Sequence, residues 1–182
     1  MHYSQSQSGF TLIEMLVAVL IFSLSLVALM TIASRTIGSN RSAQNEITAQ
    51  FLAMEGIEVM RHIRDTNYVR GDTWDEVLND CAGQDCFITI SNNPIGSGYF
   101  YDVQTCNGIC PNILYDQVSY RMSASSGDMT PFIRTLSVEY DSRTDFQDAL
   151  MRITSEVRWQ QGRVPRVTTM HLILADWQNP QP

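Results

Sequence analysis

One carboxylate, Glu14, lies inside the longest apolar run of the chain. Residues 10–33 number about 24, enough to cross a bilayer as one helix, and Glu14 is their only charged residue. A charged side chain at the centre of a membrane helix costs about 2.5–3.5 kcal/mol on insertion scales. Ionisable residues in such helices therefore usually serve a function, and Glu14 is the first candidate for one.

Cleavage of the peptide bond after Gly9 would create a chemical partner for this carboxylate. The new α-amine would lie on Phe10, about one helical turn from Glu14. In a bundle of such helices, Glu14 of one subunit could face the amine of a neighbour. Two groups that are each costly in lipid would then neutralise each other. The polar residues 1–9 would be the removed leader.

Residues 9–14, Gly-Phe-Thr-Leu-Ile-Glu, followed by the long apolar run, resemble the class III signal of type IV prepilins and pseudopilins. The resemblance implies that prepilin peptidase cleaves after Gly9, that Phe10 is N-methylated and that Glu14 is the assembly carboxylate. It implies a single-pass protein of the cytoplasmic (inner) membrane that later joins a cell-surface or periplasmic filament. Its partners would be other pilin subunits and the inner-membrane assembly platform.

Two other kinds of segment have a similar composition. An ordinary secretory signal has an apolar core of about 7–15 residues with a small-residue cleavage site after it, and the core here is longer. An uncleaved anchor on an unrelated exported binding domain or enzyme is the other alternative. The leader lacks the Lys or Arg usual in prepilins, and Arg35 and Arg41 beyond the span would favour a cytoplasmic C-terminal side. The motif and the cysteines favour export instead.

Charge and composition exclude several kinds of chemistry. All 12 basic residues are arginines, so a lysine Schiff base, a lysine isopeptide crosslink and a P-loop lysine are impossible. The formal net charge of −7 makes the chain a poor general binder of nucleic acid. We expect no cofactor and no direct contact with nucleic acid.

The four cysteines delimit a module at residues 81–110. An even number in an exported domain favours two disulfides. A hairpin of residues 87–90 and 99–103, with a loop at 92–98, would bring Cys86 opposite Cys106 and Cys81 opposite Cys110. Local bridges, Cys81–Cys86 and Cys106–Cys110, are equally compatible with the sequence. A zinc site is a weaker alternative because the CxxC spacing is missing.

Helical periodicity continues beyond the apolar run, which we assign to residues 10–33. A soluble half at 34–65 would complete one helix from about Phe10 to about Asp65, with a soft point at residues 38–40. Two apolar stripes lie on nearly opposite faces of this half: Ala43, Ile47, Phe51 and Met54 on one, and Leu52, Val59 and Ile63 on the other. One stripe would support the globular part and leave the opposite stripe to neighbouring molecules, unless the domain buries the helix on all sides. Residues 53–61 resemble the same region of V-type minor pilins and I-type pseudopilins.

The remaining chain, residues 66–182, is expected to be the globular domain. Residues 73–78 predict a short helical turn capped by Asp72 or Thr73, residues 111–116 a loop and residues 117–124 a strand. Alternation is clearest in residues 132–177, with strands at 132–140, 151–159 and 167–177. The residues predicted to face the core are Leu136, Val138, Tyr140, Met151, Ile153, Val157, Trp159, Met170, Leu172 and Leu174. The expected class is α+β, a long helix packed on a C-terminal antiparallel sheet, the pilin "ladle".

No residue pattern indicates a catalytic centre. His2, His62 and His171 are scattered, and the local sequence suggests no set of nucleophile, histidine and acid. Asp141, Asp145 and Asp148 predict a solvated acidic turn, with calcium binding as a lesser alternative. We therefore expect a structural subunit of a type IV pilus or pilus-like filament, not an enzyme. The alternatives are a pseudopilin of a type II secretion or DNA-uptake system and the membrane-anchored domain described above.

Overall fold

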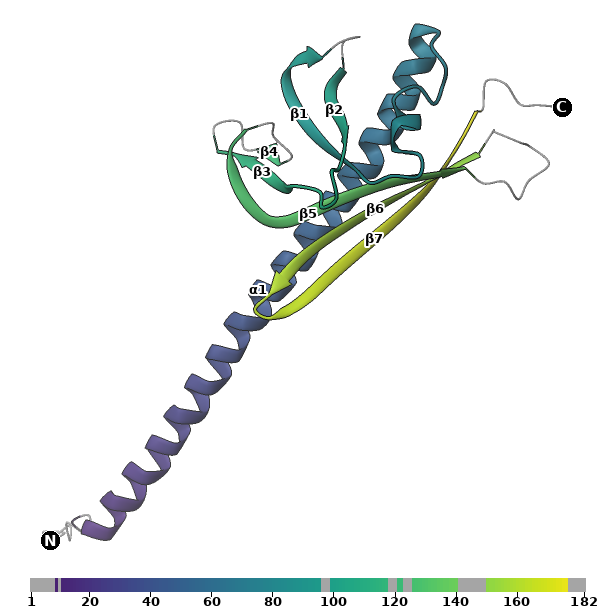
Figure 1. Ribbon diagram of the computed structural model, residues 1–182. Helices are drawn as coiled ribbons and strands as arrows, with labels where there is room; N and C mark the ends of the chain where they lie inside the picture. Colours follow the sequence, from purple (N-terminus) through teal and green to yellow (C-terminus); the bar gives the residue numbers. More distant parts are fainter. Residues whose placement is uncertain are drawn as a thin grey trace, which may run out of the picture. The chain divides into compact units, whose positions relative to one another are not determined.

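The computed structural model describes residues 9, 11–95, 99–117, 121–122, 126–140 and 150–176, with side chains described outside 91–95, 99–100 and 121–122. These residues form one long helix, a 3-10 helix and a seven-stranded sheet (Figure 1). Two compact units divide the chain at residues 44 and 45. The α+β class is confirmed, since the C-terminal half of helix α1, Leu12–Arg70, packs on an antiparallel sheet.

Helix α1 begins at Leu12 because Thr11 caps it. The N–H of Glu14 donates to the Thr11 hydroxyl at 3.3 Å and to the Thr11 carbonyl at 3.1 Å, which satisfies a helix donor that would otherwise have no partner. The start was predicted at about Phe10, which lies outside the described residues, and the described helix begins two residues later. The helix is continuous through residues 38–40, where a soft point was expected.

The helix ends at Arg70, five residues after the predicted end at Asp65. Gly71 has φ of 77° and donates its N–H to the Tyr68 carbonyl, while the N–H of Asp72 donates to the Asn67 carbonyl at 3.0 Å. These two bonds form a Schellman motif, which needs a left-handed residue that glycine supplies without strain. Glycine right after the helix, not the polar stretch before it, therefore sets the boundary.

The sheet is antiparallel throughout its named strands. Its order is β2-β1-β5-β3-β4, and β6 pairs with β5 on one side and β7 on the other. The strands are β1 Cys86–Ile95, β2 Tyr99–Thr105, β3 Asn112–Asp116, β4 Arg121–Met122, β5 Asp128–Tyr140, β6 Leu150–Gln161 and β7 Val164–Ala175. The three predicted C-terminal strands correspond to β5, β6 and β7, each longer at its start than expected.

Three local predictions are wrong. Residues 112–116 form β3 and not a loop, because Thr130 of β5 donates its hydroxyl to the Ile113 carbonyl at 2.7 Å and accepts Asn112 Nδ2 on its own carbonyl. Strand β1 continues to Ile95, through the first four residues of the loop predicted at 92–98. The helical turn lies in the 3-10 helix η1, Leu78–Cys81, which follows Val77 at φ 71° without a side-chain cap.

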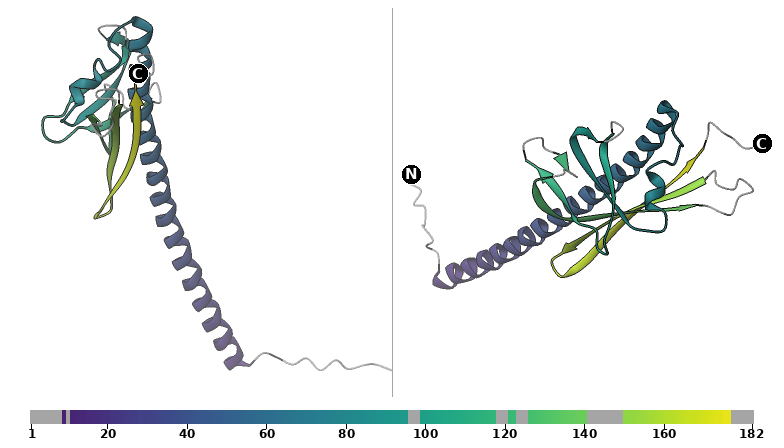
Figure 2. Two further views of the ribbon diagram at one scale, coloured as in Figure 1. Left: turned by 90° about the vertical axis from the view of Figure 1, so that its right-hand side faces the viewer. Right: turned by 45° about the horizontal axis from the view of Figure 1, so that its top comes forward.

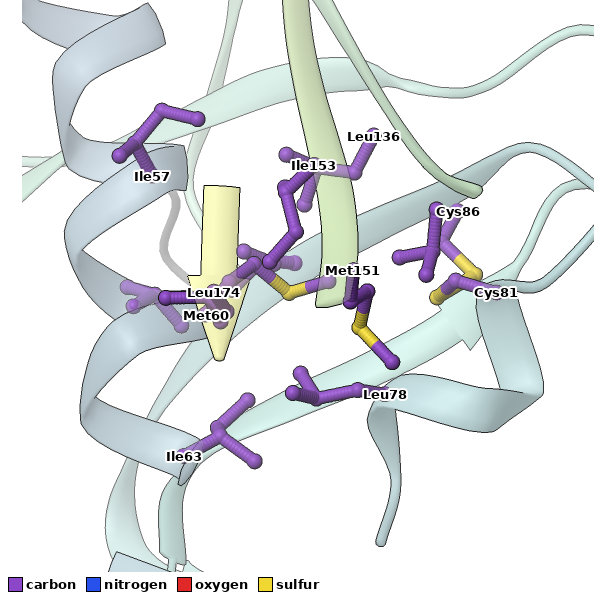
Figure 3. Close-up of a cluster of buried hydrophobic side chains, with 13 residues drawn as sticks. Ile57, Met60, Ile63, Leu78, Cys81, Cys86, Leu136, Met151, Ile153 and Leu174 are labelled. Atoms are coloured by element: carbon purple, nitrogen blue, oxygen red, sulfur yellow. A yellow bond between two sulfur atoms is a disulfide. The ribbon is translucent and has the colours of Figure 1, made fainter. Parts of the chain in front are cut away.

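The hydrophobic core lies between one face of the sheet and the C-terminal half of α1. Figure 2 shows this half of the helix running along the sheet. Ile57, Met60 and Ile63 of the helix meet Leu136, Ile153 and Leu174 of the sheet (Figure 3). Most of the predicted core residues are buried. Met170 and Leu172 are only half-buried. Tyr140 is 39 % exposed because its side chain extends outward, where the hydroxyl donates to Asp75 Oδ2.

Candidate functional site

The N-terminal motif is presented at the start of α1. Gly9 is exposed, Phe10 lies outside the described residues, and Glu14 is an exposed residue of the first helical turn. A carboxylate in this position interacts favourably with the positive end of the helix dipole. Thr11 and Glu14 thus act together locally, one as the cap and the other as the acidic residue three positions later. The Thr11 cap was not foreseen, although Thr-x-x-Glu is its usual signal.

The apolar first part of α1 presents its side chains outward. Every residue from 11 to 41 is exposed, including Leu12 at 79 % and Met30 at 72 %. Among the described helices, α1 alone is long and apolar enough to span a membrane. A continuous apolar surface of this size on a water-soluble protein is rare, so it requires lipid or other protein as its surroundings.

Hydroxyl side chains within this segment are compatible with lipid because they bond back to the helix. Ser25 donates to the Ile21 carbonyl at 2.8 Å and Thr31 to the Val27 carbonyl at 2.9 Å. Ser23, Ser34 and Thr36 make the same kind of bond to a preceding turn. Their polar atoms therefore need no water, which leaves Glu14 as the costly polar group of the segment.

The cysteines form the two local bridges, Cys81–Cys86 and Cys106–Cys110, with Cα–Cα distances of 5.7 and 4.9 Å. The nested alternative does not occur because the hairpin register differs by one residue from the predicted one. Cys86 lies opposite Thr105 and not Cys106. A shift of one residue turns a side chain to the other face of the sheet. With all four sulfurs in disulfides, the described cysteines offer no thiolate to zinc.

An ion pair that sequence reasoning missed joins the helix to the sheet. Arg134 of β5 is 2 % exposed and donates through Nη1 to Glu55 Oε2 at 2.6 Å and to the Leu52 carbonyl at 3.0 Å. The signal was present, since Arg134 falls on the same side of its strand as the buried Leu136 and Val138. A charge at such a position requires a partner.

Gly56, beside this ion pair, allows the helix and the sheet to approach closely. A Cβ added here would lie 2.7 Å from Ser155 Oγ and 3.1 Å from Leu136 Cδ2. We call Glu55, Gly56 and Arg134 the helix–sheet seam. The residues Glu55-Gly56, which contribute to the resemblance to minor pilins and pseudopilins, therefore have a structural role here.

The remaining candidates for chemistry lie apart from one another. The His62 ring packs edge-on against Tyr101 at 5.5 Å, and His171 Nδ1 is 3.0 Å from the Thr154 hydroxyl. Among the described residues, no three His, Cys, Asp or Glu side chains are placed to hold a metal ion. His2 and the acidic residues Asp141, Asp145 and Asp148 lie outside the described part of the chain.

A pocket of about 440 Å³ lies between β1, β2 and β3. Its polar side chains include Arg134, which is held by Glu55, and Gln104, which bonds Asp102. The described residues that line it include no histidine and no cysteine. Nothing in this lining pairs a nucleophile with a base.

Comparison with known proteins assigns the N-terminal segment. The family profile of the prokaryotic N-terminal methylation motif matches residues 4–30, which include Gly9, Phe10 and Glu14. No curated protein and no solved structure matches the chain. Within this match, residues 11–30 form the capped, outward-facing apolar start of α1 described above. The chain therefore carries the class III signal that is the hallmark of type IV pilin-like proteins.

Proposed function

We propose that this chain is a structural subunit of a type IV pilus or pilus-like filament. Prepilin peptidase removes residues 1–9, Phe10 is methylated, and the apolar part of α1 passes from the membrane into the filament core. The observation that carries the proposal is the methylation motif at residues 4–30 on a helix whose residues 11–41 are all exposed. Such a surface fits lipid before assembly and neighbouring helices after it.

In this proposal Glu14 serves assembly. The hydroxyls of the segment bond their own helix, so the carboxylate is the group that gains most from a partner. The amine of a neighbouring Phe10 supplies that partner and registers the incoming helix. Because an unpaired Glu14 carboxylate is costly in lipid, the register that pairs it with this amine is favoured over other registers of the two helices.

The globular unit would be carried by the same helix through the helix–sheet seam. Any force transmitted along α1 reaches the sheet through its buried face, where Arg134 bonds Glu55 and the Leu52 carbonyl. The exposed stripe on the opposite face supports contacts with neighbours: Ile47 is 53 %, Phe51 66 % and Met54 47 % exposed. This distribution contradicts the alternative of a helix buried on all sides.

Glu14→Ala tests the proposal. Membrane insertion and leader removal should be unchanged, and the amount of subunit in sheared filaments should fall at least tenfold, in line with about 1.4 kcal/mol or more of lost docking energy. Glu58→Ala, which removes an exposed carboxylate farther along the same helix, is the matched control and should assemble normally. Equal filament incorporation of both variants would refute the assembly role of Glu14.

A pseudopilin of a secretion or DNA-uptake system is the second candidate. The resemblance of residues 53–61 to both V-type minor pilins and I-type pseudopilins supports it equally. The fraction that contains the wild-type subunit separates the two. Surface filaments released by shearing contain a pilus subunit, whereas a pseudopilin stays with the cell envelope while secretion or DNA uptake depends on it.

A further inference from the structure

The outer edge of β7 is an unpaired strand edge. Among the described strands, β7 bonds to β6 from Val164 to Ala175 and to no other (Figure 1). The helix contacts β7 at Thr168, whose hydroxyl bonds Glu46, and at the end of the strand, where the Tyr68 hydroxyl lies 3.5 Å from the Ala175 carbonyl. Residues 164–167 at the start of β7 are all exposed, and beyond them the outer-face residues Thr169, His171 and Ile173 are exposed.

This edge lacks the features that usually prevent strand addition. Sheet edges are commonly protected by charged side chains, proline, bulges or short length. Pro165 and Arg166 lie at the start of β7, but the nine residues 167–175 contain no charge, no proline and no glycine. Their register with β6 has no irregularity. The outward N–H and C=O groups of such a strand are satisfied most completely by another extended backbone.

Side chains around the edge indicate the chemistry of the occupant. Val167 and Ile173, six residues apart on the outer face, are each 56 % exposed. Arg163 and Arg166 are exposed where β6 turns into β7. Residues 150–176 hold four arginines and two acidic residues, whereas the whole chain holds 12 basic and 19 acidic residues. This hairpin is therefore a locally cationic part of an acidic protein.

We propose that the β7 edge binds an extended segment of a different protein by β-strand addition. The segment carries apolar side chains opposite Val167 and Ile173 and acidic side chains beside Arg163 and Arg166. The β7 strand of a second copy is a poor match, because residues 164–175 contain no acidic residue. The proposal does not depend on the filament role, and failure of leader processing would leave it intact.

The test uses the full chain in mild detergent and a labelled synthetic peptide of roughly ten residues. The peptide has valines six positions apart, threonines between them and two glutamates at one end, and both chain directions are made. Fluorescence anisotropy should show saturable binding for one direction. Replacing the glutamates by lysines should weaken binding on the order of tenfold, as should Ile173→Lys in the protein.

Two proline variants separate strand addition from simple apolar contact. Neighbouring N–H groups point to opposite edges, so one of Thr168→Pro and Thr169→Pro removes an outward donor while sparing the β6–β7 bonds. That variant should keep its melting temperature and lose peptide binding. If both variants unfold, the two peptide directions decide instead, because strand addition selects one direction whereas simple apolar contact tolerates both. Absence of saturable binding, equal binding of the lysine peptide, or a dimer in sedimentation that Ile173→Lys abolishes would each overturn the proposal.

Discussion

Mutation of the two partners of the buried ion pair in the helix–sheet seam should lower the free energy of unfolding by different amounts. Arg134 is 2 % exposed in its side chain, whereas Glu55 is 28 % exposed. Glu55→Gln takes the neutralising carboxylate away from a guanidinium that water does not reach. Arg134→Met leaves a carboxylate that can be hydrated and puts an unbranched apolar side chain next to Leu136 and Gly56. Removal of Glu55 should therefore be the more costly change.

The size of the difference follows from the burial. Breaking a fully buried pair by removing one partner costs about 3–5 kcal/mol. Since Glu55 is partly hydrated and the bond from Arg134 to the Leu52 carbonyl remains, we expect about 2–3 kcal/mol for Glu55→Gln. For Arg134→Met we expect about 1 kcal/mol. The double variant should be close to Arg134→Met alone, because the uncompensated charge is then gone.

Urea unfolding of the full chain in mild detergent measures these free energies, with Trp74 and Trp159 reporting on the folded sheet unit. Glu58→Gln is the control, because its pair with Arg61 is exposed by 55 % and 39 % and should contribute less than about 1 kcal/mol. If Arg134→Met destabilises the protein as much as Glu55→Gln or more, the reasoning from burial is wrong.

Two further predictions concern the disulfides and the end of the helix. The exported protein should show no reactive thiol in a free-thiol assay, and four reactive thiols would contradict the pairing. Replacing the two cysteines of either bridge by alanines should lower the free energy of unfolding by about 2 kcal/mol, as expected for loops this short, and thermal unfolding measures the loss. Gly71→Ala should lower the free energy of unfolding by about 1–2 kcal/mol, because φ at this position is 77°. Amide hydrogen exchange in the last turn of α1 should become faster in this variant, and unchanged exchange would argue against the Schellman motif.

The outline of the fold follows from periodicity in the sequence. Alternation places Leu136, Ile153 and Val157 inward, and the structure buries all three. Periodicity also separates the buried and exposed stripes of α1, since Ile63 is buried and Phe51 is not. Such patterns predict burial correctly because apolar side chains lie on the buried face of each element and polar side chains on its exposed face.

The errors occur where contacts distant in sequence decide the outcome. Strand β3 exists through its bonds to Thr130, whereas Pro111, Asn112 and Asp116 around its short apolar centre are turn formers and favour a loop. The disulfide pairing depends on a hairpin register that differs by one residue from the most symmetric choice. Arg134 was overlooked because an arginine in an alternating strand is usually placed on the wet face, and its partner Glu55 lies 79 residues away.

The mature N-terminus tests the central claim most directly. Mass spectrometry of the subunit purified from its native host should find a chain that begins at Phe10, with one methyl group on the α-amine. A Gly9→Val variant analysed in parallel should retain residues 1–9, because the peptidase requires the glycine. A wild-type chain that still carries the leader, or one cleaved after the apolar segment as in a secretory signal, would contradict the assignment of residues 4–30 as a functional class III signal.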